Sequence, residues 1–174
     1  AQSLKFMEDL ETLKVFVKQV SLAYENDLLS KRAKELEVRD DLTGLYNEKF
    51  THQRLDEEIK RAIHYQRPCS LILVDVDNFE GIDERHQGNL LKLVAQELEG
   101  FITDADRAAR RERDRFALIV PERNKREATQ LAETLRRRME EKGKGFHGRS
   151  VTVSAGVAEN PIDGASAEEL LQKA

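Results

Sequence analysis

The 174-residue sequence has few of the features that mark several large classes of protein. It contains one cysteine, Cys69, so no disulfide framework can form and a reduced, cytoplasmic setting is expected. It contains no run of eighteen apolar residues, so no membrane span is expected. Its start, "AQSLKFMEDL", lacks the basic and apolar regions of a signal peptide and an initiator methionine, which indicates a fragment of a longer protein. The net charge of -4 gives no support for nonspecific binding to nucleic acid.

Proline and glycine are absent from residues 4–36, which favours one long helix. Its apolar residues follow the three-four spacing of a coiled-coil seam and then continue in a shifted phase, as in a stutter. The seam comprises Leu10, Leu13, Val17, Val20 and Tyr24, and the shifted stripe comprises Leu28, Leu29, Ala33 and Leu36. Because a narrow seam on so long a helix needs a partner, we expect a parallel homodimer through this segment. The alternative is a helix that folds back on its own domain.

The rest of the chain shows helix and strand patterns in alternation. Helices are predicted at residues 48–65, 90–102 and 127–141, and Ser166 opens a last helix with a capping-box spacing to Glu169. Strands are predicted at residues 69–76, 105–111, 116–120 and 150–158. This order predicts an α/β layer fold with a mixed central sheet covered by helices.

Two acids, Asp75 and Asp77, close the first predicted strand. Alternation along a strand puts both side chains on one face, where paired carboxylates are a common way to hold magnesium for phosphoryl transfer. The alternative is that they simply end the strand in solvent. Asp114 lies in the turn between the next two strands, and its carboxylate would face Asp75 if those strands flank the first.

From Arg39 to Ala174 the chain resembles a GGDEF domain of the diguanylate cyclase family, on four motifs in the family's order. "DDLTGLYN" is similar to the opening motif D-x-L-T-G-L-x-N, and "LVDVDNF" to the metal-binding strand. "DRAARRERDRFALIVP" is similar to D-x-x-A-R-x-G-G-D-E-F-A-x-x-x-P, and "VTVSAGVA" to the penultimate strand. The resemblance implies a nucleotidyl-cyclase-like fold over residues 39–174, preceded at residues 1–38 by a coiled-coil signalling helix of bacterial cyclic di-GMP signalling. The family's last helix would follow "ELLQKA", and we attribute its lack to truncation or disorder.

Against the family pattern, the turn that names the family is degenerate. It reads Glu112, Arg113, Asp114, Arg115 and Phe116. Glu112 and Arg113 replace the glycines that let the backbone approach the triphosphate of GTP, and Arg115 replaces an acid needed for activity. The metal positions Asp75 and Asp114 survive as a vestigial magnesium site, and no other cofactor is expected. The charges make this turn either an exposed interaction surface or a product of neutral drift.

The resemblance also implies two altered ligand sites. At the guanine site, Asp83 stands at the family's asparagine and Asn89 at its final aspartate. At the inhibitory site for cyclic di-GMP, Asp106 remains, while Thr103 and Thr134 replace arginines that hold the phosphates.

These substitutions predict a catalytically inactive domain that serves as a dimeric signalling or protein-interaction module. The alternatives are a sensor that binds GTP without turnover, with Arg113 and Arg115 on its phosphates, and an active cyclase that makes cyclic di-GMP from GTP. The expected partners are a second copy of the chain and an unknown signalling protein, with no nucleic acid and no membrane.

Overall fold

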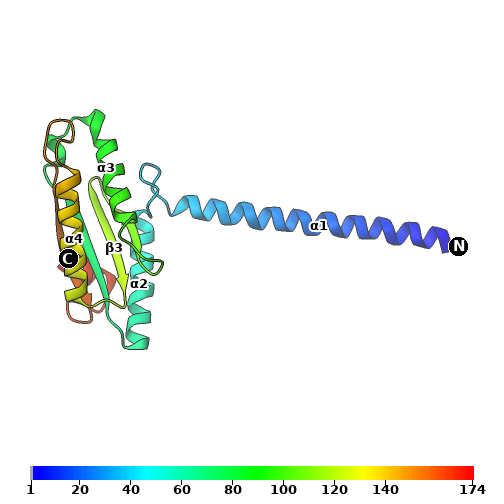
Figure 1. Cartoon of the computed structure of the whole chain (residues 1–174). Helices are drawn as coiled ribbons and strands as arrows, with labels where there is room; N and C mark the ends of the chain where they lie inside the picture. The colour runs from blue at the N-terminus through cyan, green and yellow to red at the C-terminus, as the bar shows by residue number, and fades with distance from the viewer. Residues whose placement is uncertain (1) are drawn as a thin grey trace. The chain divides into compact units, whose positions relative to one another are not determined.

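The computed structural model describes residues 2–174, with the side chains of residues 11–31, 33 and 38–174. The chain divides into two units, one ending at Val38 and one spanning Arg39–Ala174. The first unit is a single helix, α1, Gln2–Glu37 (Figure 1). The predicted helix at residues 4–36 is therefore confirmed, although the side chains of Leu10 and Leu36 lie outside the described residues.

The described side chains of α1 place apolar residues on two opposite faces. Leu13, Val17, Val20 and Tyr24 form the predicted seam, and each is more than half exposed. Val15, Leu22 and Leu29 are also exposed and recur every seven residues, which puts them on the face of the helix opposite the seam. The sequence analysis identified the first stripe but, of the second, named only Leu29, which it placed in the shifted stripe.

The second unit is built on a four-stranded sheet in the order β2-β3-β1-β4. The strands are β1 Cys69–Val76, β2 Arg107–Arg110, β3 Arg115–Pro121 and β4 Val153–Asn160. The predicted α/β fold is confirmed. All three strand pairings are antiparallel, however, and the mixed character that was expected is limited to a parallel bridge between Tyr46 and Ala109.

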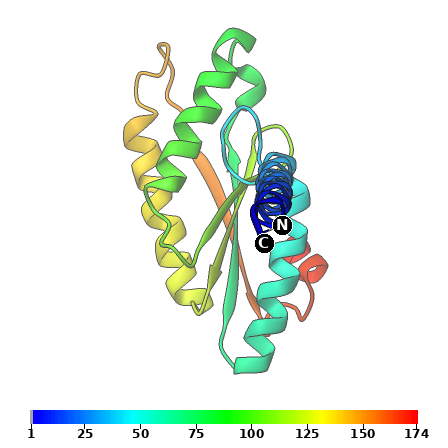
Figure 2. The same ribbon diagram turned by 90° about the vertical axis from the view of Figure 1, so that its right-hand side faces the viewer.

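Helices cover both faces of this sheet (Figure 2). The helices are α2 Glu48–Tyr65, α3 Glu84–Glu99, α4 Lys125–Lys142 and α5 Ala167–Lys173. The side chains of β1 point alternately to the two faces of the sheet. Those on one face pack with α3 and α4 in one core cluster, and those on the other face pack with α2 and α5 in a second cluster. Because Leu71 and Leu73 pack in the second cluster, strand alternation places Asp75 on the face covered by α2 and α5.

Helix α3 begins at Glu84, six residues before the predicted start at Leu90. The side chain of Asp83 caps this helix by accepting a hydrogen bond of 3.0 Å from the backbone N–H of Arg85. The stretch from Glu84 to Asn89 contains no large apolar residue, so periodicity gives no sign of the added turns. A short 3-10 turn, η1 Phe79–Gly81, was also not predicted.

The last helix has the predicted cap. Ser166 accepts a hydrogen bond from the backbone N–H of Glu169, whereas the carboxylate of Glu169 accepts from Ala165 and not from Ser166. Strand β4 begins three residues later than predicted, at Val153. Within residues 2–174, no helix is both long enough and apolar enough to cross a membrane.

Candidate functional site

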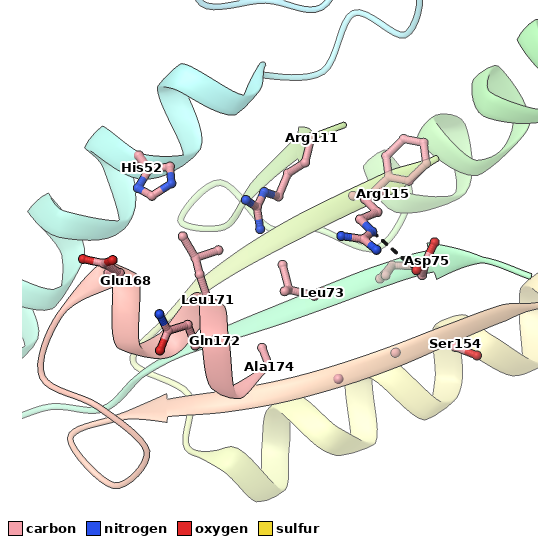
Figure 3. Close-up of a pocket in the computed structure, with 14 residues that line it drawn as sticks. His52, Leu73, Asp75, Arg111, Arg115, Ser154, Glu168, Leu171, Gln172 and Ala174 are labelled. Carbon is pink, nitrogen blue, oxygen red and sulfur yellow. Dashed lines mark ion pairs between the residues drawn. The ribbon is translucent and has the colours of Figure 1, made fainter. Parts of the chain in front are cut away.

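The end of β1 and the turn between β2 and β3 meet at one end of the sheet. The strand register pairs Asp75 with Arg115, and the backbone N–H of Val76 donates to the carbonyl of Asp114 at 3.3 Å. Two adjoining surface hollows of about 710 Å³ each share Asp75, Arg115 and Ser154. One of them, which we call the turn hollow, is lined by residues 75–81, residues 112–115 and Ser154. The other, which we call the α5 hollow, is lined in part by His52, Arg111 and Leu171 (Figure 3).

Asp75 and Asp77, the two carboxylates predicted to hold magnesium at the end of β1, have different surroundings. The carboxylate of Asp77 accepts hydrogen bonds from the hydroxyls of Thr152 and Ser154, at 2.6 and 2.7 Å, and thereby joins the ends of β1 and β4. Asp75 faces Arg115, whose Nε lies 3.5 Å from a carboxylate oxygen (Figure 3). Both side chains of this ion pair are about half exposed, so the pair is weak and easily exchanged.

Asp75 and Asp114 fit the needs of magnesium as a partial ligand set. Both line the turn hollow, and both offer the hard oxygen donors that magnesium takes together with water and substrate phosphates. Among the described residues, no group of three acidic, histidine or cysteine side chains is arranged to hold a metal ion. The remaining ligands would therefore have to come from the substrate and from water.

Every arginine of the β2–β3 hairpin from Arg110 to Arg115 pairs with an acid on another element. The pairs are Arg110–Asp40 at 3.1 Å, Arg111–Glu48 at 2.9 Å, Arg113–Glu80 at 3.2 Å and Arg115–Asp75 at 3.5 Å. The first two are partly buried, and the last two are exposed. The hairpin is thus anchored at its base and open at its tip.

Asp40 belongs to the opening motif, and its position supports the base of the hairpin. Burial raises its pKa, but hydrogen bonds from Thr43 and Arg110 outweigh this effect and leave the pKa lowered. Sequence analysis did not assign a role to Arg110, Arg111 or Glu48. These contacts span 63 to 70 residues of chain, so sequence spacing gives no sign of them.

Arg113 has a φ of +46°, the left-handed conformation that favours glycine. It stands where the resembling family has its second glycine. The turn is closed by two backbone hydrogen bonds, from Arg115 to Glu112 at 2.8 Å and from Arg111 to Arg115 at 2.7 Å. The chain therefore keeps a glycine-type turn without the glycine.

The predicted guanine positions are not brought together with this site. Hydrogen bonds from Arg85 engage both oxygens of Asp83 and lower its pKa to about 2. Asn89 is exposed on α3. Neither residue lines the turn hollow or the α5 hollow.

The predicted inhibitory positions are only partly brought together. Asp106 is 1% exposed at its side chain and accepts hydrogen bonds from the backbone and hydroxyl of Thr103, both at 2.8 Å, and from Arg123 at 3.0 Å. Arg123 was not predicted, because the sequence analysis sought an arginine only at the two family positions. Thr134 donates its hydroxyl to the carbonyl of Gln130 and lines a separate hollow with Phe101 and Arg123.

The fold is that of an α/β domain with helices on both faces of a four-stranded antiparallel sheet (Figure 2). The sequence pattern of the family described as "Diguanylate cyclase, GGDEF domain" matches residues 37–174, and the chain belongs to this family. Over 144 residues the chain is 32% identical to diguanylate cyclase VdcA of Vibrio cholerae, which covers 78% of this chain and 41% of VdcA. The chain thus spans about two fifths of the length of that relative.

Two examples among the matching solved structures show the same fold. The coiled coil and GGDEF domain of DgcB from Caulobacter crescentus, in complex with c-di-GMP, matches with a TM-score of 0.79 and 20% identity, over 90% of this chain and 86% of that one. Diguanylate cyclase SiaD from Pseudomonas aeruginosa, in complex with its activator SiaC, matches with a TM-score of 0.70 and 26% identity, over 98% of this chain and 71% of that one.

The prediction that the chain is not an enzyme is contradicted by this similarity, because the matched curated relative is a named diguanylate cyclase. The prediction gave the substitutions in the turn and at the guanine positions more weight than the domain as a whole. That domain has the fold of the family, and its turn keeps a glycine-type backbone at Arg113.

Proposed function

We propose that the chain is the GTP-binding part of a dimeric protein of cyclic di-GMP signalling, and that it belongs to the diguanylate cyclase class in function as in fold. The observation that carries this proposal is the meeting of Asp75, Asp114, Arg113 and Arg115 around the turn hollow. Such a group supplies both kinds of partner that a magnesium-bound triphosphate needs, hard oxygens for the metal and guanidinium groups for the phosphates.

Arg115 has two roles in this proposal. Without nucleotide it pairs with Asp75 at 3.5 Å, and both groups are largely solvated. An exposed ion pair contributes roughly 0–1 kcal/mol, so a triphosphate can displace the carboxylate at little cost. Arg115 then contacts phosphate, and Asp75 is freed for the metal.

Magnesium held by Asp75 and Asp114 would neutralise charge on the α-phosphate that the 3′-hydroxyl of a second GTP attacks, and on the pyrophosphate that leaves. Arg113 contributes further positive charge from the tip of the turn, where its side chain is 71% exposed. Arg110 and Arg111 do not contact the nucleotide in this proposal. They hold the hairpin in place through Asp40 and Glu48.

The proposal is tested by incubating the purified chain with GTP and Mg²⁺ and separating the nucleotides by chromatography, in parallel with calorimetry. Binding of Mg–GTP with formation of cyclic di-GMP supports the full proposal. Binding without product limits the function to GTP sensing. Absence of both at millimolar GTP contradicts the proposal.

Dimerisation through α1 is the second part of the proposal. Its support is the stripe Leu13, Val17, Val20 and Tyr24, which has no covering group within the described part of the chain. A reaction that joins two GTP molecules needs two loaded domains, and a parallel helix pair would supply them together.

Light scattering on the whole chain tests this part. We expect a dimer that is lost in the double variant Leu13→Asp with Val20→Asp. The matched control, Gln19→Asp with Asn26→Asp, adds the same charges at the same spacing on the opposite face and is expected to stay dimeric. A dimer that survives the first variant would place the contact elsewhere.

A further inference from the structure

We infer that the turn hollow binds magnesium complexes of polyphosphates with little regard to the attached base, so that ATP and inorganic tripolyphosphate bind about as well as GTP. This inference rests on the proposed function, because it names the ligand class of the same site. It concerns how the site discriminates among ligands, which depends on the groups around the place where a base would lie.

In the part of the hollow where phosphate would bind, carboxylates outnumber guanidinium groups. Arg113 and Arg115 face five acids, which are Asp75, Asp77, Glu80, Glu112 and Asp114. A free polyphosphate is repelled by such a surface, since like charges disfavour each other. The magnesium complex is the suitable ligand, because the metal is attracted by the carboxylates and the phosphate oxygens by the two arginines.

The remaining wall of the hollow offers little that could read a base. It is formed by residues 78–81, of which Asn78 is exposed. The amide of Asn78 offers both a donor and an acceptor, so on its own it suits adenine as well as guanine. Phe79 is 6% exposed and packs in the core with α3 and α4, so its ring is not free to stack on a base. Glu80 pairs with Arg113, and the carbonyl of Gly81 accepts a hydrogen bond from Arg149.

The two residues at the family's guanine positions, Asp83 and Asn89, are not available to a base in the turn hollow. Both oxygens of Asp83 are bonded to Arg85, at 3.0 and 2.7 Å, and the same carboxylate caps α3. Asn89 lies on α3 outside both hollows. A base over the turn hollow would therefore meet solvent and neutralised groups.

The expected ratio of affinities for different nucleotides distinguishes this inference from base-specific binding. A site built to hydrogen-bond one ligand rejects an analogue lacking those groups by about 10⁴-fold or more. Contacts to phosphate are the same for every nucleoside triphosphate, so affinity from them alone gives ratios near one. We expect the dissociation constants of the three complexes to agree within about threefold.

The experiment is calorimetric titration of the whole chain with Mg–GTP, Mg–ATP and Mg–tripolyphosphate, repeated with EDTA. We expect similar affinity for all three and no binding in EDTA. Arg115→Gln should weaken all three about tenfold, as expected for one charge-assisted contact. The control Arg137→Gln, which removes the same charge from an exposed position on α4, should change none of them.

A preference for GTP over ATP greater than about tenfold would overturn the inference and leave the proposed function standing. Failure of all three complexes to bind would overturn both. Equal binding that is insensitive to Arg115→Gln would place the ligand outside the turn hollow and would also overturn the inference.

Discussion

Arg113 has a backbone conformation that most side chains avoid. Its φ of +46° places it in the left-handed region, which costs an L-residue other than glycine about 1–2 kcal/mol. Its side chain pairs with Glu80 at an exposed position and recovers little of this energy. The turn therefore holds strain at one of the two arginines proposed to contact phosphate.

Replacing Arg113 tests this strain directly. Both Arg113→Gly and Arg113→Ala remove the ion pair, but only glycine adopts the left-handed conformation freely. We expect the glycine variant to be the more stable of the two by about 1 kcal/mol in urea unfolding, as the left-handed penalty predicts. Equal stabilities would show that the turn relaxes once the arginine side chain is gone.

The second residue-level prediction concerns Asp40, whose pKa is lowered by hydrogen bonds from Thr43 and Arg110 despite burial. A carboxyl group with a lowered folded-state pKa stabilises the fold above its unfolded pKa of about 3.9 and loses that contribution as the pH falls through the folded value. The variant Asp40→Asn should therefore be less stable than the parent at pH 7. The difference should persist to about pH 5 and shrink below about pH 4, measured by urea unfolding across this range. A difference independent of pH would mean that the charge of Asp40 is not its stabilising feature.

Among the elements, α3 shows most clearly what sequence could and could not predict. Its second half was predicted because Leu90, Leu91, Val94 and Leu98 follow a helical period, and all four are buried. Its first turns contain no buried residue and no large apolar one, so only the cap at Asp83 marks the start. The sequence analysis had placed that residue only at the altered guanine site.

The cap gives an element-level prediction. Asp83→Ala should lower the free energy of unfolding by about 1 kcal/mol, because the first turn of α3 loses its hydrogen-bond acceptor. Asp83→Asn keeps an acceptor and should be close to the parent. Thermal or urea unfolding of the two variants decides the matter. Equal loss in both would mean that the charge toward Arg85, rather than the cap, is what matters.

The length of helix α1 was predicted, but only one of its two apolar stripes was predicted in full. The heptad rule found the stripe at Leu13, Val17 and Val20, because it searches for one seam. The opposite stripe at Val15, Leu22 and Leu29 recurs every seven residues, but the residues that would complete that face are polar, so no three-four seam forms there. These residues are Lys18, Gln19, Glu25 and Asn26. A two-stranded coiled coil would cover the first stripe and leave the second in water.

In the whole molecule, the candidate site depends on contacts between segments far apart in sequence. The sequence analysis expected Asp114 to face Asp75 if the flanking strands paired with β1. Strand β3 does pair with β1, but the register places Arg115 opposite Asp75. The anchoring of the hairpin to Asp40 and Glu48 was not predicted, because patterns within one segment carry no information on which distant segments meet. These two anchors join the segment that follows α1 in sequence to the turn proposed to hold phosphate.

The central claim is that Mg–GTP binds at the end of β1 and the β2–β3 turn. Hydrogen exchange of the whole chain, measured by mass spectrometry with and without saturating Mg–GTP, tests it most directly. The account predicts slower exchange in peptides covering residues 75–81 and 111–116, with little change at residues 103–106 and around Thr134. Protection confined to residues 103–106 and Thr134, or no protection at all, would contradict it.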